Sequence, residues 1–385
     1  MDSTFYATYI SALKSGTTKP RVSIELLRKE DESAYSEITS DIENSSGNLT
    51  ATRQNGVRKS IDLTLINIDG KYIPDFDNQV LWFGQKFRLN LGLNIDGIDC
   101  MIPQGIFVLD NPTLNSEFSS STVNIRGLDK FALLDGTLGG ELTYTYIIPV
   151  GSNIYSVIKN LLIIGNDKKE PILDSVWMSE ITPYTITKEM GSGTIGEILI
   201  ELAGMLSANC FYNELGQFVF EPDKQDSIKG SGWDFTTEEF AYQGSNLELK
   251  YSEIYNAVLV VGDNINGTLV SYKAQNNNLL SKTSIPNLGV ERIKHIQDVN
   301  ITTLQQATDR ANYELKRTIA MQASGSLSCI PMYHLNIDDV ITLTDVKNLK
   351  LDSKRFLMSG YNIPLQIGGK MSVNIVDSTE FPFAN

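Results

Sequence analysis

The chain has 385 residues, of which 41% are hydrophobic and 20% charged, as expected for a folded protein with a sizeable core. Its net charge of −14 argues against a surface that grips nucleic acid, because such a surface needs clustered Lys and Arg, although it would suit a conduit past which nucleic acid slides. The cysteines Cys100, Cys210 and Cys329 are far apart, so neither a metal site nor a disulfide framework is expected. We also expect no signal peptide and no membrane span.

The first section, residues 1–140, is dominated by segments in which apolar and polar residues alternate, the period of a half-buried strand. A short helix or arm is expected before residue 20, and a short strand near residues 36–39. Longer strands are predicted at Val22–Leu27, Lys59–Asn67 and Lys86–Leu93, followed by a β-hairpin over Gly105–Lys130. Strands of this kind, separated by turn residues, predict a small antiparallel barrel or sandwich.

The middle section, residues 141–246, has a different pattern. Apolar residues recur at helical spacing in Gly151–Gly165, with Ser152 as a possible cap, and again in Thr194–Leu206. Thr194 and Glu197 fit a capping box at the start of the second helix. A hairpin is expected over Phe211–Pro222, so we predict an α+β domain here.

The last section, residues 247–385, returns to the strand pattern. A strand at Asn256–Gly262 with a hairpin partner at Leu269–Ala274 precedes one long helix, about 303–318. Strands at Leu335–Leu343 and a closing hairpin at Arg355–Asp377 follow. We therefore predict a second barrel with an inserted helix, and an overall fold that is α+β but mainly β, with two barrels flanking the middle domain.

The two predicted barrels show a weak internal repeat. Each has a strand (SIDLTLI or SGSLSCI), a second strand (KFRLNLGL or DDVITLTDV) and a closing hairpin whose last strand reads TVNI at Thr122–Ile125 or SVNI at Ser372–Ile375. The shared order indicates a duplication. Two unrelated antiparallel barrels that both use such strands remain the alternative, because strand patterns are degenerate.

One segment, Gly191–Gly196, matches the G-x-G-x-x-G pattern of dinucleotide sites and is followed by Glu214. Such a site needs a parallel βαβ unit with the acid at the end of the second strand. Here the helix is followed by a hairpin, with Glu214 beside its turn. A loop with a helix cap is the preferred interpretation, and we expect Gly193→Ala to change loop stability without abolishing any ligand binding.

Other candidates for chemistry are equally weak. His295 and His334 have no partner at the spacing of a metal or nucleophile site. Asp338 and Asp339 are adjacent, so in a strand they would point to opposite faces and could not act together on a glycosidic bond; a turn that enters a strand explains them better. The aromatic residues of the middle hairpin fit a core. We expect no enzyme, no cofactor and no metal.

Further segments are specific by their order along the chain, although none is a sharp motif alone. They are WFGQKFRLNLGL, QGIFVLDNPTL, VNIRGLDKFALLDG, IPVGSNIYSVIKNLL, TIGEILIELAGMLSANCFYNELGQFVFEP, IYNAVLVVG, ATDRANYELKR and LNIDDVITL. In this order, from about Val22 to Ile375, the chain resembles the central hub proteins of phage tail baseplates and related contractile injection systems.

The resemblance implies barrels of the tail-tube fold and a ring of three chains. A trimer would present a pseudo-sixfold face to the hexameric tail tube and a threefold face to the spike or tip protein. The implied partners also include the tape-measure protein and the surrounding baseplate, and phage DNA would pass through without specific binding. The implied location is the virion, after assembly in the host cytoplasm. Asp338 and Asp339 are candidates for acids that face the lumen.

Two other classes of function stay open at this point. The first is an enzyme, either a nucleotide-binding protein that uses Gly191–Gly196 or a glycan hydrolase. The second is a carbohydrate-binding tail adhesin, which should carry exposed aromatic residues on its loops, yet Trp82, Trp177 and Trp233 are scattered. A duplicated barrel has no evident role in an enzyme, so the hub is favoured.

Overall fold

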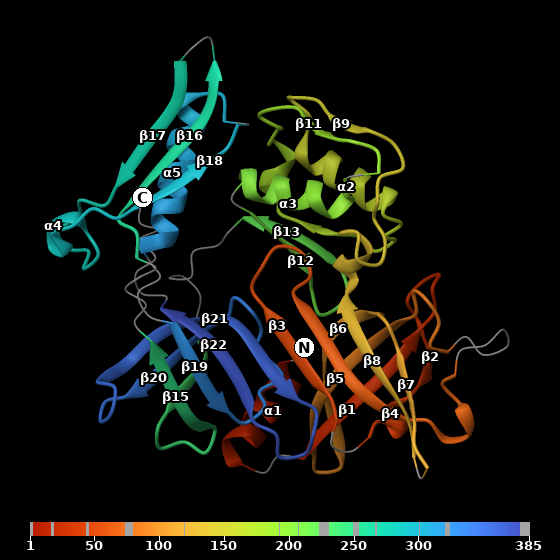
Figure 1. Cartoon of the computed structure of the whole chain (residues 1–385). Coiled ribbons are helices and arrows are strands. Elements are labelled where there is room, and N and C mark those ends of the chain that lie inside the picture. The colour runs from red at the N-terminus through yellow and green to blue at the C-terminus, as the bar shows by residue number, and fades with distance from the viewer. Residues whose placement is uncertain are drawn as a thin grey trace.

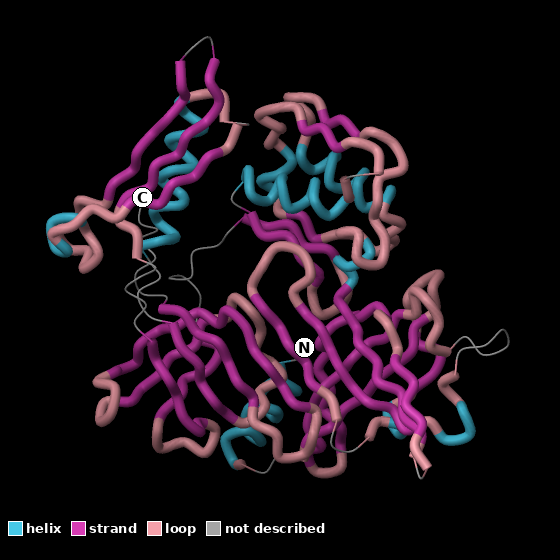
Figure 2. The backbone as a smooth tube through the Cα atoms, in the orientation of Figure 1, coloured by secondary structure: helices cyan, strands magenta, loops and turns pink. Residues whose placement is uncertain are grey.

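The structure is a computed structural model that describes residues 3–16, 19–43, 46–73, 80–118, 120–191, 193–206, 208–222, 231–248, 254–265, 268–299, 301–319 and 324–377. Figure 1 shows two layers. Two curved sets of strands lie side by side in the lower layer, and a smaller unit of strands and helices lies above each set. Figure 2 shows that strands dominate the lower layer and that the longer helices, apart from the first, belong to the upper one.

The first set begins with a helix and continues with eight strands. They are α1 (Ser3–Ser15), β1 (Pro20–Leu27), β2 (Ala34–Glu37), β3 (Asn48–Thr52), β4 (Lys59–Ile66), β5 (Lys86–Ile95), β6 (Ile98–Leu109), β7 (Thr113–Ser116) and β8 (Ser121–Asp129). The predicted strands are confirmed. The hairpin at Gly105–Lys130 is confirmed in part, because the end of β6, Phe107–Leu109, pairs with the end of β8. It is more complex than expected, because β6 also pairs with β5 from Ile98 to Val108, and a short extra strand, β7, pairs with β8. Pro112, which has no N–H to donate, lies in the break between β6 and β7.

The second set consists of six strands. They are β14 (Ser231–Thr236), β15 (Tyr242–Glu248), β19 (Ser324–Cys329), β20 (Val340–Asp345), β21 (Leu351–Pro364) and β22 (Met371–Asp377). The predicted boundary between a middle domain 141–246 and a barrel 247–385 is therefore displaced. The main chain of β14 pairs with β20, and that of β15 pairs with β19. Both pairings join residues far apart in sequence, so local patterns could not reveal them.

The two sets have the same strand order. The first runs β3-β4-β8-β6-β5-β1 and the second runs β15-β19-β22-β21-β20-β14. The register agrees as well: Val123 pairs with Leu65 in the first set, and Val373 pairs with Leu327 in the second. One pair differs, since β1 and β5 are antiparallel whereas β14 and β20 are parallel. This common order supports the duplication inferred from TVNI and SVNI.

A ladder between the sets merges them into one 14-stranded sheet. The end of β21, Gly360–Pro364, pairs antiparallel with β3, Asn48–Thr52. A single hydrophobic core extends under both sets, and α1 contributes the buried Tyr9 and Leu13 to it. The two barrels expected from the sequence are thus one continuous structure within a single chain.

The middle unit lies above the first set in Figure 1. Its elements are β9 (Tyr146–Ile148), α2 (Ile154–Ile164), β10 (Ile172–Leu173), β11 (Ile186–Lys188), α3 (Ile195–Leu206), β12 (Ala208–Tyr212) and β13 (Phe218–Pro222). The capping box of α3 is confirmed, because Glu197 N donates to Thr194 Oγ1 at 3.1 Å and Thr194 N donates to Glu197 Oε2 at 3.4 Å. The cap of α2 is Asn153 rather than the predicted Ser152.

The unit above the second set is larger than the single inserted helix that the sequence predicted. It contains β16 (Ala257–Ile265), β17 (Thr268–Gln275), α4 (Ile285–Leu288), β18 (Ile293–Gln297) and α5 (Leu304–Ile319). Three strands form a separate sheet in the order β17-β16-β18. The α5 residues Ala307, Ala311 and Leu315 pack in its separate core, whereas Leu304 at the start of the helix is exposed.

The packing of α1 against the second set leads to a pH prediction. His334 is half-buried as a residue, but both of its ring nitrogens are buried, and its ring lies near those of Tyr9 and Trp233. This burial lowers its pKa to about 4. In the unfolded chain the same side chain titrates near pH ~6.5. Between these two pH values only the unfolded chain binds the proton. The folded protein therefore loses stability as the pH falls from about 6.5 to about 4.

We expect this loss to reach about 3 kcal/mol at pH 4, at about 1.4 kcal/mol for each pKa unit. A His334→Phe variant keeps an aromatic ring at this position but cannot titrate. Urea denaturation of both proteins at a series of pH values measures the difference. Equal pH slopes for the two proteins between pH 4 and 6.5 would contradict the assignment.

Candidate functional site

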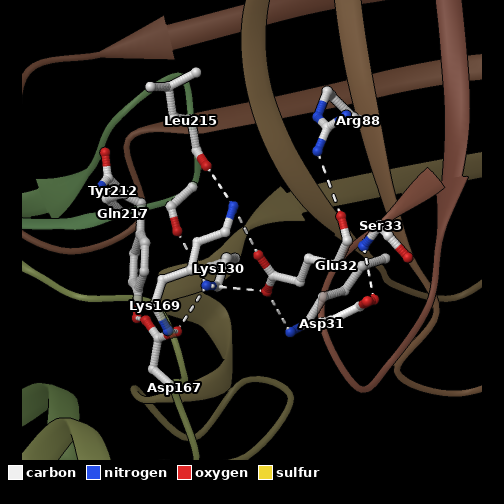
Figure 3. A network of polar contacts seen from close by, with 12 residues as sticks. Asp31, Glu32, Ser33, Arg88, Lys130, Asp167, Lys169, Tyr212, Leu215 and Gln217 are labelled. Carbon is white, nitrogen blue, oxygen red and sulfur yellow. Dashed lines mark hydrogen bonds and ion pairs between the residues drawn. The ribbon is translucent and has the colours of Figure 1, made fainter.

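The first candidate site is a buried ionic network between the first strand set and the middle unit (Figure 3). The ammonium group of Lys130 is 3.0 Å from Glu32 Oε1 and 2.8 Å from Asp167 Oδ1, and it donates to Gly216 O at 3.0 Å. Glu32 also accepts from Lys86 at 2.6 Å and pairs with Lys169 at 3.0 Å. Charges from both units therefore converge on one buried lysine.

Burial alone would raise the pKa of Glu32, but the positive charges of Lys130, Lys86 and Lys169 outweigh burial and lower its pKa to about 2. Glu32 therefore stays ionised at neutral pH and keeps its ion pairs with the three lysines. The hydroxyl of Tyr212 donates to the other oxygen of Asp167 at 2.7 Å. Through Lys130, the network connects Asp167 and Gly216 of the middle unit to Glu32 in the loop between β1 and β2.

A second cluster joins the first set, the middle unit and the second set. The buried ammonium group of Lys59, on β4, lies 3.1 Å from Glu214 Oε1 in the turn between β12 and β13. It also donates to Gln104 O at 3.0 Å and to Asn336 Oδ1 at 3.3 Å. Glu214, which the dinucleotide pattern offered as a ribose ligand, is thus the ion-pair partner of a structural lysine.

Asp338 belongs to the same junction. Its carboxylate bonds to Arg53 and lies 3.1 Å from Arg58 Nη1, and its side chain is only 14% exposed. The guanidinium group of Arg58 stacks on the ring of Phe211, with 3.8 Å between the guanidinium carbon and the ring centroid. The acid predicted to face a lumen is therefore neutralised by two arginines in this chain. Its main-chain φ of 68° marks it as a turn residue held by these contacts.

Asp339, the second predicted lumen acid, accepts a hydrogen bond from Asn336 N at 2.7 Å, so it closes the turn that leads into β20. The turn interpretation of this acid pair is confirmed. The buried acid Asp129 was not singled out by the sequence. It accepts from the main-chain N–H groups of Arg58 at 2.6 Å, Lys59 at 2.9 Å and Phe131 at 2.9 Å, which holds the β3–β4 loop against β8.

The glycine-rich segment before α3 is occupied by the chain itself. Ile195 N donates to Gly140 O at 2.9 Å and Gly196 N donates to Leu134 O at 2.6 Å. A Cβ on Gly196 would lie 2.8 Å from the Cα of Asp135, so glycine is needed for close packing. A phosphate would require these same amide groups. The pattern therefore has a packing explanation.

The other features considered are metal sites, cysteines and membrane-spanning helices. Within the described part of the chain, no three His, Cys, Asp or Glu side chains gather closely enough to hold a metal ion. The three cysteines are buried and unpaired, and burial raises the pKa of Cys210 and of Cys329 to about 12. The helices of the described residues include none that is long and apolar enough to cross a membrane.

Comparisons with known proteins were informative only at the level of structure. No family model matches the chain, and no curated protein matches it either. Among solved structures, it is similar to the 43 kDa tail protein of prophage MuSo2 from Shewanella oneidensis, with 13% identity, a TM-score of 0.64, and coverage of 94% of this chain and 99% of that one. A tail protein from Neisseria meningitidis MC58 has 11% identity and a TM-score of 0.64, with 93% and 96% of the two chains covered.

A third similar structure is an Escherichia coli component of the type VI secretion system that is described as resembling the bacteriophage T4 tail proteins gp27 and gp5. It has 10% identity and a TM-score of 0.54, with 95% of this chain and 79% of that chain covered. At these identities the likeness establishes a shared fold. The chain thus has the α+β, mainly β fold of phage tail proteins, as its sequence predicted.

Sequence patterns do not reveal most of the residues in the two buried charge clusters around Lys130 and Lys59. Lys59, Lys130 and Asp129 look like ordinary charges at the ends of strands. One sequence signal could have identified Lys59 as a buried lysine. Residues of β4 alternate strictly between buried and more exposed positions, and Lys59 occupies a buried one. The partners of Lys59 and Lys130 include residues of other units, and Asp129 bonds to Arg58 and Lys59, about 70 residues earlier, so only the folded chain identifies them.

Proposed function

We propose that the chain is a structural tail protein, the trimeric central hub of a phage tail baseplate or a related injection system. Three copies would surround a channel and join the hexameric tail tube to the trimeric spike or tip. The observation that carries the proposal is the repeated strand order, β3-β4-β8-β6-β5-β1 and β15-β19-β22-β21-β20-β14, within one continuous sheet. Two equivalent sets per chain turn threefold symmetry into six similar positions, which matches a sixfold tube on one face.

The two junctions support this function physically. A ring that transmits load between tube and spike needs its units held in one arrangement. Lys130 and Lys59 each bind partners from more than one unit in a buried setting, where separation would leave an unpaired charge. This makes the relative position of the first set and the middle unit costly to change.

The same proposal extends to partners and location. The tube, spike or tip, tape-measure and surrounding baseplate proteins would contact the ring, and DNA would pass through without specific binding. The chain would assemble in the host cytoplasm and end in the virion. Asp338 is paired with Arg53 and Arg58, so it would add little net charge to such a channel.

Electron microscopy of the purified chain, alone and with its spike partner, tests the proposal. We expect rings with threefold symmetry and a central hole. Antibody labelling of intact tails should mark the end of the tube. A protein that remains monomeric with its partner, or that labels no tail, would contradict the hub function.

The alternatives have no comparable support. The amides before α3 are bonded to the chain's own carbonyls, which argues against the nucleotide-binding enzyme. The middle-hairpin aromatics Tyr212, Phe218 and Phe220 are buried in a core, which argues against a sugar platform on that hairpin. Calorimetry with NAD, ATP and oligosaccharides would test them directly, and we expect no heat of binding.

A further inference from the structure

Three groups of complementary reactivity meet at Lys59: its own amine, the carboxamide of Asn336 and the carboxylate of Glu214. Lys59 Nζ lies 3.3 Å from Asn336 Oδ1 and 3.1 Å from Glu214 Oε1. The Lys59 side chain is only 5% exposed. Lys59 belongs to β4 of the first set, whereas Asn336 lies between β19 and β20 of the second set. An amine and a carboxamide from the two sets are therefore held together away from bulk water.

The contact with Oδ1 also places the amine near the carboxamide carbon of Asn336. A C=O bond is about 1.23 Å long, so this carbon lies no more than about 4.5 Å from Lys59 Nζ. A nucleophile attacks from about 3–3.5 Å. The terminal torsion of an asparagine side chain has a broad energy well, so a small rotation turns the face of the carboxamide toward Nζ. A short approach therefore separates the folded geometry from attack.

A second amide-bearing residue, Gln104, also contacts Lys59, but not through its side chain. Lys59 Nζ donates to the main-chain oxygen of Gln104 at 3.0 Å. The side-chain Nε2 of Gln104 donates instead to Tyr333 O at 2.9 Å. Attack on a main-chain carbonyl would break the chain, whereas attack on a side-chain carboxamide releases only ammonia. Asn336 is therefore the carboxamide that the contacts present to the amine.

Glu214 and Tyr361 occupy the positions that the reaction needs. A lysine amine attacks only when it is neutral, and the Glu214 carboxylate already accepts a hydrogen bond from it. Proton transfer within this pair gives a neutral amine and a neutral acid, which a buried site tolerates. The hydroxyl of Tyr361, a residue that is 1% exposed, donates to Asn336 Oδ1 at 3.5 Å. It therefore faces the oxygen on which negative charge develops.

The charges also set the pace of the reaction. Burial alone would lower the pKa of Lys59, but Tyr361 and Glu214 outweigh burial and raise it. The ion pair is therefore the resting form, and the neutral pair that reacts is a minor form. We expect the reaction to be slow after folding, and loss of ammonia to solvent makes it irreversible.

We propose that Lys59 and Asn336 form an isopeptide bond within the chain. Glu214 takes one proton from Nζ, and the freed lone pair attacks the carboxamide carbon of Asn336. Negative charge then lies on Oδ1, opposite the Tyr361 hydroxyl. Glu214 hands its proton to Nδ2 and takes the second proton from Nζ, while the bond from carbon to Nδ2 breaks. The products are a secondary amide, ammonia and a protonated Glu214, which returns its proton to solvent because its side chain is 34% exposed.

The balance is one amine and one carboxamide converted to one amide and one ammonia, so the reaction needs no oxidant, cofactor or water. The bond joins β4 to the loop before β20, beside the ladder between β3 and β21. The two strand sets are then tied covalently as well as by the sheet. The bond forms within one chain, so it does not depend on the proposed ring.

Mass spectrometry of the full-length chain, denatured after long incubation at mildly alkaline pH, tests the bond. We expect a mass lower than that of the unmodified chain by one ammonia. Trypsin does not cut after an acylated lysine, so residues 59–71 should appear joined to residues 318–347. A cyclic imide at Asn55, which precedes Gly56, would also release ammonia. It would join no peptides, so the joined peptide is the decisive product.

Three comparisons test the assigned roles. Glu214→Gln keeps the size of the side chain but cannot take the proton, so we expect no joined peptide. Tyr361→Phe keeps the buried ring and should slow the joining, because the hydroxyl opposite Oδ1 is lost. Lys130 is the control in the same digest, since it is also buried but bonds to two carboxylates and a main-chain oxygen. We expect it to remain a free lysine.

The wild-type chain alone decides the matter if a variant fails to fold. Separate peptides for Lys59 and Asn336 after incubation would overturn the bond. Conversion of Asn336 to aspartate with Lys59 free would overturn it too, because water would then be the attacking group. A joined peptide in folded Glu214→Gln would refute the proton transfer through Glu214. Rings without the bond would count against the bond alone, and the bond without rings would count against the hub alone.

Discussion

Replacement of Lys130 by Met is expected to lower the free energy of unfolding by about 3–5 kcal/mol, the usual cost of removing one member of a buried ion pair. Lys130 is 1% exposed and bonds to Glu32, Asp167 and Gly216 O at once. Met has a similar shape but leaves the pairing of both carboxylates incomplete in a buried site. Thermal and urea denaturation measure the loss.

Hydrogen exchange should locate the same effect. The turn between β12 and β13, which contains Gly216, is expected to exchange faster in Lys130→Met, because its anchor to the first strand set is gone. Lys159→Met is the matched control, since Lys159 pairs with Glu170 on the exposed surface of α2. We expect no measurable change in melting temperature there. A similar response of both variants would show that burial of the network contributes nothing.

The network also has a predictable pH dependence. The pKa of Glu32 is lowered to about 2 by its lysine partners, so its contribution to stability is present above the ordinary carboxyl pKa. That contribution is lost as the pH falls toward 2. It acts at lower pH than the loss expected from His334, so the two can be separated in one titration.

Replacement of Arg58 by Met should have the second large effect, again about 3–5 kcal/mol. The Arg58 side chain is only 3% exposed, pairs with Asp338 and stacks on Phe211. Without the Arg58 guanidinium group, Arg53 is the one arginine still paired with Asp338. The stacking of Arg58 on Phe211 is lost as well. Urea denaturation measures the change in free energy.

A double-mutant cycle isolates the pair. Arg58→Met, Asp338→Asn and the double variant should show a coupling energy of about 0.5–3 kcal/mol, as residues in one network do. Arg53→Met serves as the control on the same carboxylate, because the Arg53 side chain is more exposed, at 20%. Its loss should cost less than that of Arg58, since water screens the remaining charge. Additive effects of Arg58→Met and Asp338→Asn would contradict the proposed coupling.

Much of the fold follows from local patterns in the sequence. The strand alternation in β4 and β5 gives each residue a face, and the 3.6-residue spacing in α2 and α3 gives each helix a buried side. The capping box at Thr194 is likewise local, since both hydrogen bonds span three residues. These features need no knowledge of the rest of the chain.

Parts of the chain with long-range pairing could not be predicted in this way. The strands β14 and β15 follow the middle unit in sequence but belong to the second set, because they pair with β20 and β19, which come much later in the chain, as in the pairs Ser231–Val340 and Tyr242–Cys329. The same is true of the unit that contains β16 and α5. Its sheet and separate core are visible only once β18 is seen beside β16.

What the sequence determined by itself is therefore the class of the longer strands and helices, the repeat of TVNI and SVNI, and the absence of any recognised catalytic motif. Tertiary structure alone decided that the two sets share one sheet, that Asp338 is paired with Arg53 and Arg58, and that Lys130 and Lys59 are buried. The physical reason is that periodicity reports which face a residue occupies, whereas ion pairs and sheet ladders depend on which distant segment lies opposite that face.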